Sequence, residues 1–186
     1  LLYKAIFHQA ETRAQFLADL LCRPLAADKQ PPRTASISEL VDYFAHAPAS
    51  NETFIRNLAR VKKTIQEDFH CPLNDRDQSR LEYVYAAFRD RGLGLSFQFS
   101  SYGRSGYGGF PTLGDLVLQT DLQGRLGNFL AGDDDYRFVR RLQELNRIIP
   151  VTGDFAGPKA LASVGAYLRE KGYTVSAFYT SNVEQF

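Results

Sequence analysis

The residues best suited to ligand chemistry lie in a glycine-rich turn at positions 153–157. Gly153 and Gly157 would let the backbone approach a ligand closely, and the free N–H groups at the start of a following helix favour an anion or a polar atom. Between them, Asp154 could accept hydrogen bonds from a ribose hydroxyl or an amine, and Phe155 adjoins it. The alternative is a tight turn from a strand into a helix, with Asp154 as the helix cap. The sequence supports both interpretations equally.

A second candidate group consists of Asn182 and Glu184, which follow the apolar run 174–179. At that position, polar side chains could orient a substrate. Taken alone, the pair is better interpreted as the polar end of a strand.

A third candidate group lies in the glycine-rich stretch 100–110 and comprises Tyr102, Arg104 and Tyr107. The tyrosines could stack on a planar group, and the arginine could pair with a carboxylate or phosphate. Glycines make such a loop costly to order, and loops of this kind are often functional. A surface loop that packs its aromatic side chains elsewhere is the slightly better supported alternative.

No metal site is expected from the remaining titratable residues. His8, His46 and His70 fall on or near separate predicted helices, so they do not form the cluster that a zinc ion needs. The acidic run 133–135 is typical of a helix N-terminus, where negative charge complements the helix dipole. No sequence motif identifies a catalytic nucleophile.

The elements around the glycine-rich turn predict a βαβ unit over residues 148–186. Residues 148–152 form an apolar, β-branched run, Pro158 suits the first position of a helix, and residues 174–179 suggest a second strand. Ligands of parallel sheets sit beyond the carboxyl ends of the strands, which is where Asp154 and Asn182 would both lie.

The rest of the chain predicts helices. Residues 1–92 form a mostly helical part, with residues 11–15 on the exposed side of the first helix. Residues 93–147 contain the Gly/Tyr-rich loop and connecting helices. Helix starts are indicated by capping residues at five positions: Ser36, Ser50, Asn74, Thr112 and Asp133.

Composition excludes several classes of protein. Hydrophobic residues make up 44% and charged residues 23%, and the net charge of +1 argues against a surface that coats nucleic acid. No apolar run is long enough for a membrane helix, and the N-terminal residues do not resemble a signal peptide. With only Cys22 and Cys71, a reducing, cytoplasmic location is expected. The absence of Met and a start within a helical pattern indicate a fragment of a longer protein.

Residues 148–158 and 177–185 resemble a poorly characterised bacterial family with a class I methyltransferase-like Rossmann core, as do residues 1–5 and 97–111. The resemblance implies that 148–154 is the third strand, with Asp154 bonded to the adenine amine of S-adenosylmethionine. It also implies that 174–182 is the fourth strand, with Asn182 facing the methyl group and substrate. The glycine-rich loop and ribose-binding acid of such enzymes are absent from this chain, which would be an internal fragment.

These observations predict an α/β fold: a partial Rossmann-like sheet with a mostly helical insertion, forming one partial domain over residues 1–186. The expected function is binding of S-adenosylmethionine, with methyl transfer to an unknown small molecule or protein group. The alternative is a non-catalytic domain that binds a partner or small ligand through the Gly/Tyr-rich loop. A small-molecule ligand is expected in either case, without nucleic acid or membrane.

Overall fold

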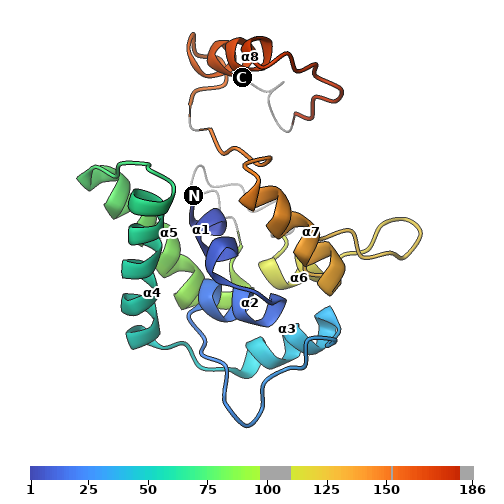
Figure 1. Cartoon of the computed structure of the whole chain (residues 1–186). Coiled ribbons are helices and arrows are strands. Elements are labelled where there is room, and N and C mark those ends of the chain that lie inside the picture. The colour runs from blue at the N-terminus through green and yellow to red at the C-terminus, as the bar shows by residue number, and fades with distance from the viewer. Residues whose placement is uncertain (97–109, 152, 181–186) are drawn as a thin grey trace, which may run out of the picture. The chain divides into compact units, whose positions relative to one another are not determined.

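A computed structural model of the chain describes residues 1–96, 110–151 and 153–180, and its elements are helical (Figure 1). They are α1 (Leu2–Gln9), α2 (Arg13–Leu21), α3 (Ile37–His46), α4 (Asn51–Lys63), the π-helix η1 (Thr64–Asp68), α5 (Asp75–Arg91), the 3₁₀ turn η2 (Gly92–Gly94), α6 (Leu113–Leu118), α7 (Asp133–Glu144) and α8 (Ala160–Glu170).

The predicted Rossmann-like sheet is wrong. Residues 148–151 and 173–180 form no strand, and the only pairings between extended residues in the described ranges are isolated bridges, Ser96 with Thr112 and Thr120 with Leu126. A β-branched run becomes a strand only when a neighbouring strand accepts and donates its backbone hydrogen bonds. The structure therefore contradicts the resemblance to a methyltransferase-like Rossmann core. The predicted βαβ unit over residues 148–186 is wrong for the same reason.

Three helices begin where the sequence predicts, each at a capping box. The N-cap side chain accepts a hydrogen bond from the backbone N–H three residues later, and the acidic side chain at that later position accepts one from the backbone of the cap. The pairs are Ser36 with Glu39, Asn74 with Asp77, and Thr112 with Asp115. Ser50 caps α4 through the N–H of Thr53. These starts depend on residues adjacent in sequence, which is why the pattern locates them.

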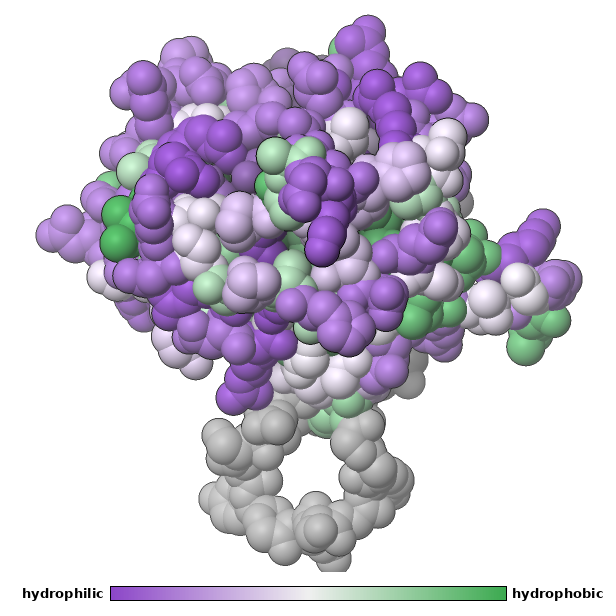
Figure 2. All heavy atoms as spheres, turned by 90° about the horizontal axis from the view of Figure 1, so that it is seen from below, coloured by the Kyte–Doolittle hydropathy of each residue, from purple (hydrophilic) through white to green (hydrophobic). Residues whose placement is uncertain are grey.

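The chain divides into two compact units, Leu1–Ile148 and Ile149–Phe186. Within the first, α1 and α2 lie between α4 and α5 on one side and α7 on the other (Figure 1). Its core contains stacked and tilted aromatic rings, among them Phe7, Phe16 and Tyr136, which are almost fully buried. Burial of such large apolar side chains is the main stabilising contribution. The face in Figure 2 is mostly hydrophilic, with separate hydrophobic areas.

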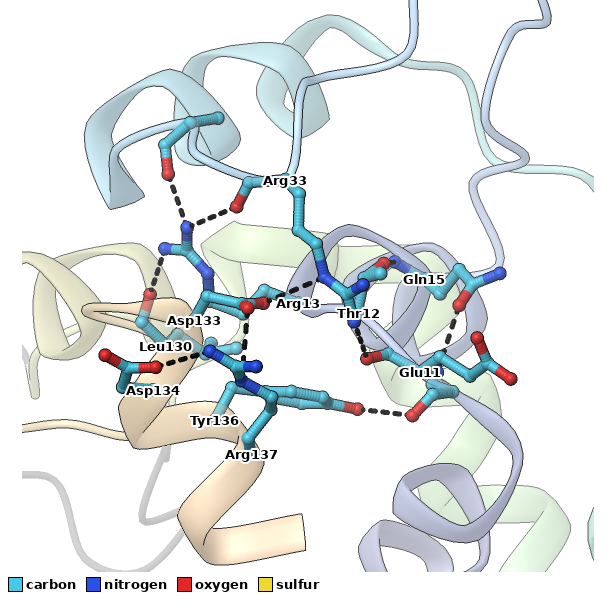
Figure 3. Close-up of polar contacts among 12 residues, drawn as sticks. Glu11, Thr12, Arg13, Gln15, Arg33, Leu130, Asp133, Asp134, Tyr136 and Arg137 are labelled. Carbon is cyan, nitrogen blue, oxygen red and sulfur yellow. Dashed lines mark hydrogen bonds and ion pairs between the residues drawn. The ribbon is translucent and has the colours of Figure 1, made fainter.

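A buried arginine connects distant segments of the first unit. Arg13, only 4% exposed, donates four hydrogen bonds to backbone carbonyls: those of Leu130, Ala131, Arg33 and Ala35. Figure 3 shows the bonds to Leu130 and Arg33. Glu11 and Gln15 are exposed, as predicted, but Arg13 between them is not. Its planar guanidinium provides the several donors that these carbonyls need.

In the described part of the second unit, α8 is the one helix, and the turn before it and the segment after it have no regular structure. Across the described residues of both units, every helix is too short or too polar to cross a membrane.

Candidate functional site

The predicted cofactor-binding turn is closed by its own hydrogen bonds. Asp154 Oδ1 accepts a hydrogen bond from the N–H of Ala156 at 3.0 Å, and the Asp154 carbonyl accepts one from Gly157 at 3.2 Å. α8 begins two residues after Pro158, with Lys159 at its N-cap and no side-chain cap. Asp154 therefore neither caps the helix nor follows a strand; it stabilises a local turn.

Packing contacts explain why Gly153 and Phe155 occur in this turn. A Cβ atom on Gly153 would lie 2.4 Å from the Cβ of Ala160, so only glycine allows this approach to α8. The ring of Phe155 stacks on Phe178, with 6.3 Å between centroids. A role for Gly153, Asp154, Phe155 and Gly157 in binding S-adenosylmethionine stays a prediction, without the strand ends that suggested it.

The other predicted ligand residues lie outside the described part of the chain. They are Tyr102, Arg104 and Tyr107 of the Gly/Tyr-rich loop, and Asn182 and Glu184 near the end of the sequence.

A small pocket in the first unit brings together functional groups that the sequence did not connect. We call it the α1–α7 pocket; its volume is about 170 Å³. Its lining residues come from α1, from the end of η1 and from the end of α7: Lys4, His8, Asp68, Phe69, Gln143, Glu144 and Asn146. It is smaller than the roughly 300 Å³ at which pockets for drug-sized ligands begin, so it suits a small ligand.

A histidine and a carboxylate face each other in this pocket. His8 Nε2 lies 3.6 Å from Asp68 Oδ2, and both side chains are about half exposed. The ring of Phe69 lies edge-on to His8, with 5.6 Å between centroids. A carboxylate beside an imidazole can orient the ring, so the pair offers a hydrogen-bond donor and an acceptor to a ligand.

Lys4 supplies the positive charge of the pocket. Its Nζ donates a hydrogen bond to the Gln143 carbonyl oxygen at 3.0 Å and lies 5.5 Å from the centre of the Phe69 ring. Burial lowers the pKa of Lys4, because removal from water disfavours the ammonium form. Two further N–H groups of the ammonium are available to an acceptor.

A buried acceptor in Gln143 has no donor. Among the described residues, nothing donates a hydrogen bond to Gln143 Oε1, although this atom is removed from solvent. Leaving such an acceptor unpaired costs about 1–3 kcal/mol. Buried polar atoms are almost always satisfied, and Gln143 is also one of the residues that line the pocket.

The backbone around the pocket is irregular. η1 is a π-helical segment, a conformation that is rare and concentrated at functional sites. His70 and Asn146, just beyond η1 and α7, adopt positive φ angles of 51° and 52°. A residue other than glycine is strained in the left-handed region of backbone conformation, and such strain is concentrated at functional sites. This strain therefore supports a functional role for η1 and for the end of α7.

Sequence reasoning missed this pocket because its parts lie far apart in the chain. His8 and Asp68 belong to different helices, and no local spacing pairs them. The described residues contain no group of three or more His, Cys, Asp or Glu side chains placed to hold a metal ion.

Comparison with known proteins gives one match. Residues 32–186 match the family described as a domain of unknown function, DUF7790, a range that includes η1 and α7 but not α1. No curated protein and no solved structure matches the chain.

Proposed function

The chain belongs to the DUF7790 family, whose description assigns no activity, and we propose from the geometry of the first unit that it binds a small zwitterion of the amino-acid class in the α1–α7 pocket. The observation that carries this proposal is the ammonium of Lys4, which donates a hydrogen bond to the Gln143 backbone carbonyl in the same pocket that the Asp68 carboxylate lines. The ammonium and the carboxylate favour ligand groups of opposite charge within one small pocket.

The charges of the lining residues favour a ligand with both signs. Lys4 would pair with a carboxylate, while the Asp68 carboxylate would accept hydrogen bonds from an ammonium group. Glu144 lines the same pocket, but Arg140 at 3.3 Å and Arg141 at 3.7 Å compensate its charge. Phe69 offers an apolar surface for the ligand's carbon atoms.

Binding requires only that His8 donate or accept a hydrogen bond, so it does not depend on catalysis. The alternative is that water satisfies Gln143 Oε1 and that the pocket has a structural role. The two alternatives differ in one measurable property, saturable binding.

The test is calorimetric titration of the full chain with each of the common amino acids. We expect at least one to bind saturably and Lys4→Met to weaken that binding at least about tenfold, since a hydrogen bond to a charged group contributes roughly 1.5–3 kcal/mol. Lys63→Met is the matched control, because Lys63 is an exposed lysine paired only with Glu67 on the surface. Absence of saturable binding, or equal effects of the two substitutions, would contradict the proposal.

We also propose that the protein works in the cytoplasm. Cys22 and Cys71 are both unpaired, and free thiols persist in a reducing compartment. Fluorescence microscopy of the tagged protein would test this location, and a signal outside the cytoplasm would contradict it.

A further inference from the structure

An apolar groove lies between α5 and α6, and we call it the α5–α6 groove. Its volume is about 490 Å³, and almost all of its lining is apolar. Tyr83, Val84 and Phe88 of α5 form one wall, and Phe110, Leu113 and Leu116 form the other.

The side chains of this groove are more exposed than large apolar residues usually are. Tyr83 is 78% exposed, Phe110 55% and Leu116 49%. Clustered exposure of this kind marks an interaction surface, whereas single exposed apolar residues need no explanation.

The backbone of the second wall is held in place. Leu113 donates its N–H to the Leu95 carbonyl at 2.8 Å, and Ser96 Oγ donates to the Phe110 carbonyl at 2.8 Å. The capping box at Thr112 then fixes the start of α6. These hydrogen bonds therefore fix the backbone of the second wall of the groove.

Positive charge lies at both ends of the α5 wall. Arg80 precedes Val84 by four residues, and Arg91 follows Ala87 by four, so these side chains share one face of the helix. The two arginines are 11 positions apart (91 − 80), a length of about 16 Å or three helical turns at 1.5 Å per residue. Neither arginine forms an ion pair with another described residue, whereas Arg89 on another face pairs with Asp90 at 2.7 Å.

The acidic residues near the groove are already engaged. Glu82 pairs with Lys62 at 3.7 Å, and Asp115 accepts the hydrogen bonds of the Thr112 cap. The described surface thus presents an apolar centre flanked by two unpaired cations, and a complementary partner is apolar in its centre and acidic at its ends.

We propose that the α5–α6 groove binds an amphipathic helix of a partner protein. The apolar face of this helix packs on Tyr83, and acidic residues about three turns apart pair with Arg80 and Arg91. Partner helices commonly bind apolar grooves in this way, anchored by side chains on successive turns.

Charge argues against two other occupants. A symmetric dimer through this groove would use the same surface on both copies. It would bring Arg80 and Arg91 of one copy close to the same two arginines of the other. The chain's own segment 97–109 contains Arg104 and no Asp or Glu, so it cannot neutralise Arg80 and Arg91. A small molecule would find few polar groups in the lining to orient it.

The test uses two fluorescein-labelled helical peptides with the same leucine face, one with glutamates and one with lysines at both ends. Fluorescence anisotropy with the full chain should show at least tenfold tighter binding of the acidic peptide, and its affinity should fall as salt is added. Arg80→Glu should abolish this preference, because the new carboxylate offsets the remaining positive charge of Arg91.

Tyr83→Glu should weaken binding of the acidic peptide at least tenfold, and its high exposure makes misfolding of this variant unexpected. Ile55→Glu is the matched control, because Ile55 is a 60% exposed apolar residue on α4, outside the groove. Equal binding of the two peptides, or equal effects of Tyr83→Glu and Ile55→Glu, would overturn the proposal.

Two further results would identify a different occupant. Self-association in sedimentation experiments that Tyr83→Glu abolishes would assign the groove to a second copy. Peptide binding that occurs only after residues 97–109 are replaced by a short Gly/Ser linker would assign it to that segment. Either result would overturn the proposed partner.

Discussion

The hydroxyl of Tyr136 donates a hydrogen bond to the carbonyl of Ala10 at 2.9 Å, joining two residues that are 126 positions apart (Figure 3). Tyr136 lies in the first turn of α7, and Ala10 is the C-cap of α1. Tyr136 is fully buried and stacks on Phe7 of α1. One side chain therefore satisfies the end of α1 and fills the core beside it.

Tyr136→Phe removes this hydrogen bond while keeping the ring. We expect the free energy of unfolding to fall by about 1–2 kcal/mol, because the Ala10 carbonyl would lose its buried donor. Urea denaturation followed by circular dichroism would measure the change. Tyr83→Phe is the control, since Tyr83 is exposed and should change stability by less than about 0.5 kcal/mol. Equal losses in the two variants would contradict the role of the hydroxyl.

Alkaline pH should destabilise the first unit. Burial raises the pKa of Tyr136 and of Tyr85 above the usual value of 10.0, because both phenols are removed from water. The stability that comes from keeping them protonated is complete below pH 10.0 and decreases as the pH rises beyond it. Each such group makes the free energy of unfolding fall by up to about 1.4 kcal/mol more per pH unit.

Denaturation series at several alkaline pH values would measure this slope. Tyr136→Phe should lose stability less steeply than the wild type, because the contribution of Tyr136 is removed while those of other buried groups such as Tyr85 and Tyr3 remain. Identical slopes would show that Tyr136 does not titrate with unfolding.

Arg13 and Arg137 should contribute very different amounts to the free energy of unfolding, although both belong to the polar contacts of Figure 3. Arg13→Met would remove all four donors from buried carbonyls, and we expect a loss of at least about 3 kcal/mol. Arg137→Met would remove ion pairs with Asp133 and Asp134 that are exposed to solvent, so a loss below about 1 kcal/mol is expected. Thermal and urea unfolding of the two variants would compare them directly.

Two glycines of the second unit should respond in opposite ways to alanine. Gly153→Ala places a Cβ atom 2.4 Å from that of Ala160 and should loosen the turn before α8. Gly165→Ala meets nothing within 4 Å inside α8, so it should stabilise the helix by about 1 kcal/mol. Hydrogen exchange of the α8 amides would report both effects. Faster exchange in Gly165→Ala, or none of the expected loosening in Gly153→Ala, would contradict the packing described here.

Local patterns predicted much of the helical part because the responsible contacts are local. The capping boxes that begin at Ser36, Asn74 and Thr112 each depend on two residues three positions apart. The three helices that follow them begin as predicted. α7 is a partial exception: its N-cap is Gly132, and Asp133, the predicted cap, is its first residue. Because Asp133 still complements the helix dipole there, the pattern was correct about the helix and displaced by one position at its start.

The predicted sheet failed because strands are not local structures. Residues 148–152 and 174–179 have suitable side chains, but a ladder also needs a partner strand, which the sequence pattern cannot supply. The same limitation applies to buried polar residues. Arg13 follows a polar segment and was predicted to be exposed, whereas carbonyls from distant parts of the chain surround its guanidinium.

The candidate site was hidden for a related reason. His8 was interpreted as an isolated helical histidine, and only the fold brings Asp68 to 3.6 Å from it. No single residue of the α1–α7 pocket belongs to a recognisable motif. The irregular η1 segment also had no sequence signal, because Thr64 to Asp68 continue the pattern of α4.

The packing of α1 against α7 has a consequence for synthesis of the chain. The ribosome makes α1 first, and α7 emerges only after the intervening helices. Until then, Phe7 lacks the stacked ring of Tyr136 and the nascent chain exposes part of its future core. Such exposed apolar surface is what chaperones bind and what promotes aggregation. Chains released before α7 should therefore be the aggregating products of interrupted translation.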